Sequence, residues 1–358
     1  MVEREGRQLI TSHKVHILDP LTDPRWSGFV ERHQAASVFH SRGWLRTLQM
    51  TYGYEPLAVT TSMPTEPLTN ALLFCVVRSW VTGDRMVSLP FTDHCEPLVE
   101  NIEQFRSLCV HLETLRSTQR WKYTEIRTSS AFLGSAESLK ECKVYHWHRL
   151  DLRPSLDELY KGFHRDCIRR RIRHAERQNL RYEEGRHESL VRSFYDLIVT
   201  TRLRKCLPPQ PFEWFQNLIA HMEENVCLRV AFNQDRPVAG ILTMNHGKTV
   251  SYKYGGSDAG CNHLGATPML LWRTIQAAKT SGMEVLDLGR SDIENWGLIR
   301  FKERWGAQSV RLALWRSPTH EVSPSLEHLK MRLAKTVCAS VPVKMLVLAG
   351  RLMYRHAG

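Results

Sequence analysis

The sequence is poor in the patterns that mark metal sites, disulfide frameworks and membrane spans. Its nine cysteines are scattered and odd in number, and no C-x-x-C pair occurs, which argues against a zinc signature and against a disulfide framework. No stretch approaches the roughly 20 apolar residues that cross a bilayer. The charged start of the chain, MVEREG, lacks the apolar segment of a signal peptide. We therefore expect a cytoplasmic protein whose thiols stay reduced.

Common catalytic and nucleic-acid-binding motifs are also missing. There is no H-E-x-x-H, G-x-S-x-G or G-x-G-x-x-G pattern, and Gly247-Lys248-Thr249 lacks the glycines that precede it in a P-loop. That tripeptide also falls in a predicted hairpin turn rather than at a helix start. No helix-turn-helix, RRM or zinc pattern accompanies the many arginines, so we expect no DNA partner and no metal site.

The positive charge is unevenly distributed along the 358 residues, whose net charge is +12. Residues 1–150 contain 17 Lys and Arg against 16 Asp and Glu, a balance of +1; the remainder contains 32 against 21, a balance of +11. This asymmetry favours an acidic partner for the second half: phosphates, an acidic carrier protein, nucleic acid or an anionic membrane surface. The alternative is a solvated basic face without a partner.

The length favours two domains, because single hydrophobic cores stop growing at roughly 250–300 residues. Hydrophobic periodicity predicts a similar order of helices and strands in two domains, 1–150 and 151–318. In the first we expect helices at 41–51 and 101–118 and strands at 56–62, 70–80, 85–89 and 122–128. In the second we expect helices at 156–179, 189–204, 212–224, 267–280 and 296–305 and strands at 227–233, 237–245, 249–256, 283–289 and 309–315.

Capping residues predict where some of these helices begin and end. Ser41 is a good N-cap for the first helix. Thr267 followed by Pro268 is typical of an N-cap and a first helical position, and Gly282 is typical of a helix C-terminus.

Residues 319–358 form a distinct basic tail, with six Lys and Arg against two Glu. Apolar residues recur in it at helical spacing, which predicts an amphipathic helix. We expect this helical tail to pack on the first domain. The alternative is a helix that lies on a membrane surface.

A first candidate binding region is the arginine-rich segment 165–181, which carries seven arginines and two acidic residues on a predicted helix. Arg169, Arg173 and Arg177 follow one another at i, i+4 spacing, where like charges repel by a few tenths of a kcal/mol per pair. An anionic ligand would relieve that repulsion, and guanidinium groups suit phosphate. We therefore expect Arg169, Arg170 and Arg173 to bind an anion and to face a cleft between the domains. The alternative is a solvated basic helix.

A second candidate region follows the strand predicted at 249–256. Its sequence, Ser251-Tyr-Lys-Tyr-Gly-Gly-Ser-Asp258, is followed by a helix start at Gly265-Ala-Thr-Pro. A strand that ends in glycines and leads into a helix presents free backbone N–H groups to an anion. We expect one wall of a site here, formed by Tyr254, as a candidate catalytic residue, and by Ser257, Asp258 and His263. The alternative is an ordinary strand–loop–helix junction.

A third candidate region follows the strand predicted at 283–289, where open α/β sheets usually bind ligands. A lysine here can hold a phosphate or stabilise the oxyanion of acyl transfer, so Lys302, at the exposed end of its short helix, is the main candidate catalytic residue. The alternative is that Phe301 and Trp305 pack in the core and Lys302 is merely solvated. The candidate binding residues around it are Arg290, Ser291, Asn295 and Arg300.

The order and spacing of these segments resemble the Fem-type branch of the GNAT superfamily. That branch includes peptidoglycan aminoacyltransferases and acyltransferases associated with exopolysaccharide or cellulose synthesis. The resemblance covers roughly residues 38–316, and its matching segments are Phe39–Trp44, Ser88–Asp93, 169–180, 252–258, 287–291 and 297–307.

The resemblance implies an α/β fold of two tandem GNAT-like domains, each a mixed central sheet flanked by helices, with the C-terminal helical tail. It implies an enzyme that transfers an acyl or aminoacyl group to an amine in cell-envelope, peptidoglycan or exopolysaccharide biosynthesis. Lys302 matches the lysine of the family's Phe-Lys pair. The loop 260–266 keeps only a remnant of the Q/R-x-x-G-x-G/A pattern that holds the CoA pyrophosphate in ordinary GNAT enzymes.

The same resemblance implies no tightly bound cofactor. The donor is then acyl-CoA, an acyl-carrier protein or aminoacyl-tRNA, and the acceptor is a small molecule or a glycan precursor. With such substrates the protein is expected at the inner face of the membrane, which it would contact through its basic tail.

A second hypothesis is a non-catalytic accessory or scaffold protein of an exopolysaccharide or cellulose synthesis machine. The sequence shows no neighbouring histidine and aspartate that would form a dedicated base, and this keeps the alternative open. Acyl transfer does not require such a base, because positioning alone can lower the barrier by several kcal/mol.

Overall fold

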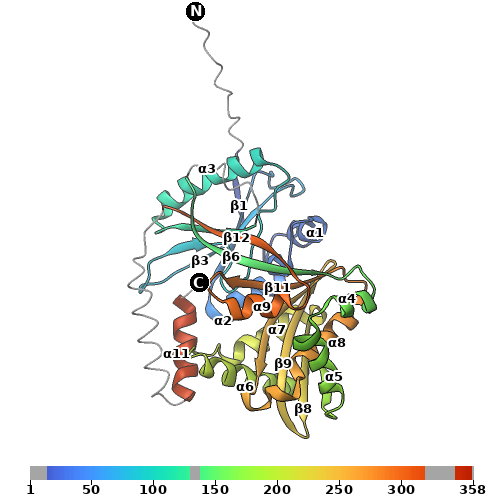
Figure 1. Cartoon of the computed structure of the whole chain (residues 1–358). Helices are drawn as coiled ribbons and strands as arrows, with labels where there is room; N and C mark the ends of the chain where they lie inside the picture. The colour runs from blue at the N-terminus through green and yellow to red at the C-terminus, as the bar shows by residue number, and fades with distance from the viewer. Residues whose placement is uncertain (1–13, 130–137, 319–342, 357–358) are drawn as a thin grey trace, which may run out of the picture.

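The computed structural model describes residues 14–129, 138–318 and 343–356, which form a mixed α/β protein on one continuous sheet. The sheet has twelve strands in the order β1-β2-β3-β4-β5-β12-β6-β11-β10-β9-β8-β7. Strands of the first half lie at one end and strands of the second half at the other, with β12 and β6 between them (Figure 1). The predicted mixed α/β class is confirmed.

The first half contributes mainly antiparallel strands, and only β4 and β5 pair in parallel. The last strand of the sheet, β12, returns from the end of the second half to pair with β5 on one side and β6 on the other. The strands of this region are β1 (His16–Leu18), β2 (Glu55–Thr60), β3 (Leu72–Val77), β4 (Arg85–Val87), β5 (Thr124–Thr128), β6 (Lys140–Asp151) and β12 (Gln308–Ser317).

The second half is antiparallel except at one place, where β10 and β11 pair in parallel. Its strands are β7 (Arg181–Gly185), β8 (Val226–Asn233), β9 (Arg236–His246), β10 (Thr249–Ser257) and β11 (Val285–Asp292). The three strands predicted between 227 and 256 are confirmed within one residue at each boundary.

Helices cover both faces of the sheet (Figure 1). The α-helices are α1 (Arg25–Arg32), α2 (Arg42–Tyr52), α3 (Ile102–Gln119), α4 (Leu156–Gly162), α5 (Arg170–Glu176), α6 (Glu188–Arg204), α7 (Phe212–Met222), α8 (Ala266–Thr280), α9 (Trp296–Glu303) and α11 (Val343–His356). Short helical turns are η1 (Val38–His40), η3 (Arg165–Arg169, a π-turn), η4 (Glu223–Asn225) and η5 (Ala259–Leu264).

One hydrophobic core joins the two halves, because α2 of the first packs on α7 of the second. Trp44 meets Trp214 edge to face, with ring centroids 5.4 Å apart. A Cβ at Gly43 would collide with the main chain of His221, so glycine lets the two helices approach closely. The side chain of Ser41 caps α2 by accepting from the N–H of Trp44 at 3.3 Å, as predicted.

Two predicted helices differ from the structure, and the elements β1, α1, β6 and β7 were not predicted. The single helix expected at 156–179 is broken, because Phe163 adopts an extended backbone and buries its ring against Trp272 and Trp305. The chain then continues as η3 and α5. Helix α8 begins one residue before Thr267, after Gly265 in a left-handed conformation. Strand β6 was not predicted, because its first half is exposed and shows no apolar run.

Of the tail, the structure describes only α11, and the segment 319–342 lies outside the described residues. Helix α11 contacts both halves. The Tyr354 carbonyl accepts from the hydroxyl of Tyr54, and the Tyr354 hydroxyl donates to the carbonyl of Pro208 at 2.8 Å. Arg85 donates to the carbonyl of His356 at 2.7 Å. Within the described residues, no helix combines the length and the apolar character that crossing a membrane requires.

Candidate active site

The sheet opens where β10 and β11 part. The two strands pair only from Thr249–Ser251 to Val285–Asp287. Beyond that point β10 follows β9 to Ser257, while β11 follows β6 to Asp292. Adjacent parallel strands that part at their carboxyl ends create the opening in which α/β sheets bind ligands. The predicted candidates on β10 and β11 therefore flank one opening.

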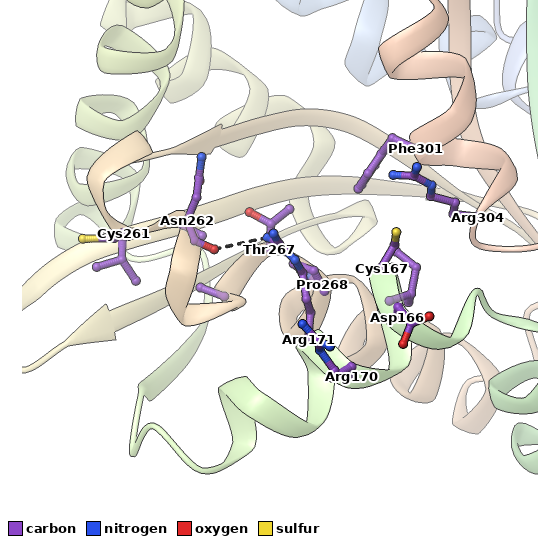
Figure 2. A pocket seen from close by; sticks show the side chains of 14 residues that line it. Asp166, Cys167, Arg170, Arg171, Cys261, Asn262, Thr267, Pro268, Phe301 and Arg304 are labelled. Atoms are coloured by element: carbon purple, nitrogen blue, oxygen red, sulfur yellow. Dashed lines mark hydrogen bonds between the residues drawn. The ribbon is translucent and has the colours of Figure 1, made fainter.

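An arginine-lined pocket of about 520 Å³ lies at the carboxyl end of β10, beside the first turn of α8. Arg170 and Arg171 of α5 and Arg304 after α9 line it, and Arg171 donates to the Asn262 carbonyl at 3.4 Å (Figure 2). The lining includes Ala266–Pro268, and the N–H groups at a helix start have no helical partner. Positive side chains and a helix N-terminus together favour an anion such as phosphate.

A second hollow of about 550 Å³ adjoins it and shares Arg170 and Arg171; we call the two together the basic pocket. Arg170, Arg173 and His263 thus come together as predicted sites. Arg169 lines neither hollow and keeps a buried Nε without a hydrogen-bond partner. The expected orientation toward the interdomain cleft is wrong, because every lining residue comes from 166–304.

The glycines of β10 serve packing rather than ending the strand. Gly255 and Gly256 continue the β9–β10 ladder, which runs on to Ser257. A Cβ at Gly256 would lie 2.7 Å from the main chain of Leu197. The glycine therefore allows α6 to pack closely against β10, and the strand ends at Ser257, one residue after the two glycines.

The other candidates on this wall are held by local contacts. The N–H of Ser257 donates to Thr201 Oγ1 at 2.9 Å. Asp258 accepts from the N–H of Gly260 at 2.9 Å and forms an ion pair with Arg236, which fixes the start of η5. The hydroxyl of Tyr254 accepts from Trp214 Nε1 at 3.1 Å. These three residues do not line the basic pocket.

Lys302 is buried, and the expectation of an exposed helix end is wrong. Its side chain turns inward from α9, and Nζ donates to the carbonyls of Gly289 and Arg290 at 2.8 and 2.9 Å. Burial lowers the pKa of Lys302 to about 8, although Asp93 and Asp287 oppose the change. Lys302 therefore fixes the irregular stretch of β11 and carries an ammonium group that holds its proton less tightly than an exposed lysine does.

The remaining candidates around β11 divide between buried and exposed positions. The guanidinium of Arg290 stacks 4.6 Å from the ring centroid of Tyr145, and burial lowers the pKa of Arg290. Ser291 is buried with an unpartnered hydroxyl. Asn295 caps α9 by accepting from the N–H of Leu298 at 3.2 Å. Arg300 is exposed on the outer side of α9.

A buried ion pair joins the two halves beside the opening. The ladder between β9 and β10 skips Lys253, and this bulge directs its side chain to Asp93 of the first half, with Nζ and Oδ2 2.7 Å apart. Burial alone would raise the pKa of Asp93, but the charges of Lys253 and Arg290 hold it below its usual range. Gly289, at φ +70°, lies so close to Asp93 that a Cβ there would be 3.1 Å from the carboxyl carbon.

The structure also brings together a histidine and an aspartate that are far apart in the sequence. His94 Nε2 lies 3.3 Å from Asp287 Oδ2, and Asp287 Oδ1 accepts from Trp147 Nε1 at 2.8 Å. Leu89 and Phe91, just before this histidine, have left-handed φ values of 57° and 61°. Such strain in non-glycine residues clusters at functional sites.

Sequence reasoning missed His94, Asp93 and Lys253 as site residues. The matching segment Ser88–Asp93 was the available signal, because it ends at Asp93 and directly precedes His94. The pairing itself depends on the contact between the halves. The scaffold hypothesis stayed open because the sequence shows no neighbouring histidine and aspartate. The folded protein does contain such a pair, His94 and Asp287.

Comparison with known proteins agrees with this architecture. Residues 162–303, which include the opening and the lining of the basic pocket except Arg304, match the acetyltransferase (GNAT) domain family. The crystal structure of FemX superposes with a TM-score of 0.62 at 13% identity, covering 88% of this chain and 100% of that one. No curated protein matches the sequence.

Two further structures share the fold. The C-terminal domain of a protein assigned as a lysylphosphatidylglycerol synthetase, from Agrobacterium fabrum, gives a TM-score of 0.55 at 12% identity, with 87% and 94% of the two chains covered. A tandem GNAT protein from the clavulanic acid biosynthesis pathway gives 0.54 at 10% identity, with 86% and 100% covered. Residues 162–303 thus match a GNAT acetyltransferase domain, and the whole chain shares its fold with FemX and with a tandem GNAT protein.

Proposed function

We propose that this acyltransferase moves an acyl or aminoacyl group from a phosphate-bearing carrier to an amine in cell-envelope, peptidoglycan or exopolysaccharide biosynthesis. The observation that supports the proposal most strongly is the basic pocket beside the carboxyl end of β10, one of the two strands that part. The likeness in fold to FemX and to the lysylphosphatidylglycerol synthetase domain supports an envelope substrate.

The basic pocket suits the phosphates of the donor. Arg170, Arg171 and Arg304 surround the start of α8, and no acidic side chain other than Asp166 lines the two hollows. Acyl-CoA, an acyl-carrier protein and aminoacyl-tRNA all carry phosphate on the arm or the terminal nucleotide that bears the acyl group. The pocket recognises the phosphate that all three donors share. The donors differ in the part of the carrier beyond that phosphate.

The transfer itself takes place at the opening between β10 and β11. Negative charge develops on the carbonyl oxygen during the attack of the amine, and positioned donors stabilise it. Lys302 is our candidate for this role, either directly through its third N–H or by holding the backbone of Gly289 and Arg290. The acceptor is a small-molecule or glycan-precursor amine.

Binding measurements test the donor proposal. CoA, acetyl-CoA, holo-acyl-carrier protein and aminoacyl-tRNA should be titrated into the wild type and into Arg170→Gln/Arg171→Gln at several salt concentrations. We expect one of the four to bind the wild type, with an affinity that falls as salt rises, and to bind the variant more weakly. Arg106→Gln, an exposed change on α3, is the matched control. Equal binding and an equal salt dependence in all three proteins would reject the donor site.

We also propose that α11 contacts an anionic membrane surface, as expected for an envelope enzyme. Its packed side is marked by Leu346, while Met345, Leu348 and Leu352 are 58–60% exposed on the opposite side. Trp80, 90% exposed, lies at the end of α11 with its ring 6.0 Å from that of His356. Exposed apolar residues beside Arg351 and Arg355 on a chain of net charge +12 suit anionic headgroups.

A further inference from the structure

We propose that the pocket around His94, Glu96 and Asp287 binds the acceptor as a primary ammonium ion, and that His94 takes its proton. The inference rests on the acyl-transfer function proposed above and names the acceptor class. The pocket measures about 270 Å³ and lies between the halves. The first half contributes His94 and Glu96 to it, and the second half contributes Asp287 and Ser251.

His94 is held from one side only. Its Nε2 faces Asp287 at 3.3 Å, while its Nδ1 is buried without a hydrogen-bond partner. Asp287 is fixed as an acceptor, because Oδ1 already accepts from Trp147 Nε1 and from the N–H of Gly289, at 2.8 and 2.7 Å. Asp287 therefore favours the tautomer with its proton on Nε2, and the lone pair of Nδ1 stays free.

The space beside Nδ1 suits an ammonium group. Glu96 Oε1 lies 3.8 Å from Nδ1 and is held in place by the N–H and the hydroxyl of Ser129, which donate to it at 2.9 and 3.0 Å. In our proposal a small turn of the His94 ring uncovers the buried Nδ1, and a nitrogen to one side of both atoms then lies within about 2.8–3.0 Å of each. Glu96 supplies the opposite charge, and the Trp147 ring, 4.2 Å from the His94 ring, supplies an aromatic wall. A neutral alcohol of the same size would gain neither the ion pair nor the proton transfer.

Titratable and charged groups reach His94 and its pocket from several elements. Asp287 belongs to β11, Glu96 to the same loop as His94, His40 to η1, Arg149 to β6 and His246 to β9. Burial lowers the pKa of His40 to about 3, so that ring stays neutral and does not compete for the proton. The two carboxylates and the Arg149 guanidinium, which stacks on the Trp147 ring, therefore set the charge around His94.

The pocket adjoins the point of transfer. Ser251 and Asp287 form the last residue pair before β10 and β11 part, and both line the pocket. His94 Nδ1 accepts one proton from the ammonium ion and later passes it to solvent. The freed lone pair forms the C–N bond at the acyl carbon. The bond to the carrier breaks, and the second nitrogen proton leaves with the carrier's thiol or hydroxyl. Asp287 is a positioning residue in this scheme.

An NMR titration tests the amine site without any donor. Protein labelled with ¹⁵N-histidine should be titrated with n-propylamine, and with propan-1-ol as the uncharged probe of equal size. The His94 ring signals are those missing from the spectrum of His94→Gln. We expect them to move with n-propylamine and not with propan-1-ol, and Glu96→Gln to weaken the amine affinity at least tenfold. Glu100→Gln, an exposed change in the same segment, should leave it unaltered. Equal responses to both probes, or none, would overturn the proposal.

Kinetics with the donor that binds the wild type separate this inference from the proposed function. His94→Gln should bind that donor with unchanged affinity and transfer on the order of 100-fold more slowly, without the decline of the wild-type rate at acidic pH. Asp287→Asn should lower kcat more than it raises the KM for the amine. Wild-type rates and an unchanged pH profile in His94→Gln would overturn the role of His94. Failure of the wild type to bind any donor would refute the donor proposal alone, because the NMR titration stands without it.

Discussion

The basic pocket and the pocket around His94 differ in how they are built. The basic pocket comes entirely from residues 166–304, and its arginines are exposed and have no ion-pair partner among the described residues. The other pocket draws on both halves, and its His94 and Asp287 are less than 5% exposed and paired with each other. Exposed like charges cost little stability and serve binding. Buried charged groups need a partner of opposite charge. Because His94 and Asp287 come from different halves, this pocket depends on the contact between the halves.

The largest effect should come from breaking the buried ion pair between the halves. Lys253→Met leaves the Asp93 carboxylate without its partner, and removal of one member of a buried pair typically costs about 3–5 kcal/mol. We expect a loss of this order in urea unfolding. Arg192→Met, which breaks an exposed ion pair on α6, should cost less than about 1 kcal/mol. A small loss for Lys253→Met would mean that the halves do not depend on this pair, and Lys253→Met/Asp93→Asn should restore part of the stability.

Substitution of Lys302 tests its role at the opening between the two pockets. Lys302→Met keeps the apolar stem and removes the ammonium group, so turnover should fall on the order of 100-fold, mostly in kcat. The neighbouring Glu303→Gln, an exposed change on the same helix, should leave turnover within about twofold of the wild type. Wild-type turnover in Lys302→Met would remove this lysine from the mechanism.

The pH dependence of stability provides a second test of Lys302. Its pKa is about 8 in the folded protein and near 10.5 when unperturbed, so the unfolded chain binds the proton more tightly. The free energy of unfolding should therefore gain a contribution as pH rises from about 8 toward 10.5. Urea unfolding of the wild type and Lys302→Met at pH 7.5 and 9.5 measures it. The wild type should gain stability relative to the variant, and equal changes in both would contradict the burial of a charged lysine.

The basic pocket should respond more mildly, because its arginines act in parallel. Arg170→Gln/Arg171→Gln should raise the dissociation constant of the donor about tenfold, which corresponds to one lost charge-assisted contact. The urea midpoint should stay within experimental error of the wild type. A large loss of stability would show that these arginines hold α5 in place rather than serving a ligand.

The smallest effect concerns α11 and the membrane surface. Leu348→Glu/Leu352→Glu should reduce co-sedimentation with vesicles of phosphatidylglycerol and phosphatidylcholine several-fold, while Val110→Glu on α3 should not. Vesicles of phosphatidylcholine alone should retain little protein. If the variant instead changes only the oligomeric mass, the exposed side of α11 contacts a second copy of the chain.

Much of the fold could be predicted because its signals are local. The cap at Ser41 and the hairpins around β8, β9 and β10 follow from neighbouring residues. Helix α4 ended earlier than periodicity predicts, because the packing of Phe163 against Trp272 and Trp305 outweighs helix propensity. Strand β6 depends on partners distant in sequence and so gave no local pattern.

The site divides in the same way. Arg170, Arg173 and His263 could be found from a local arginine cluster and a helix start. The pairing of His94 with Asp287 could not, because 193 residues separate them and only the contact between the halves brings them together. The exposure of Lys302 was misjudged for a related reason: the carbonyls that draw its ammonium inward exist only where β11 leaves the regular ladder.

Hydrogen–deuterium exchange with a bound donor tests the central claim, that the donor and the acceptor occupy separate pockets on either side of the opening. With the carrier that binds the wild type, we predict slower exchange in residues 165–174 and 259–268, which border the basic pocket. With n-propylamine alone we predict slower exchange in residues 92–97 and 246–251, and no change around α5. Donor protection confined to the pocket around His94, or amine protection confined to α5 and α8, would contradict this account.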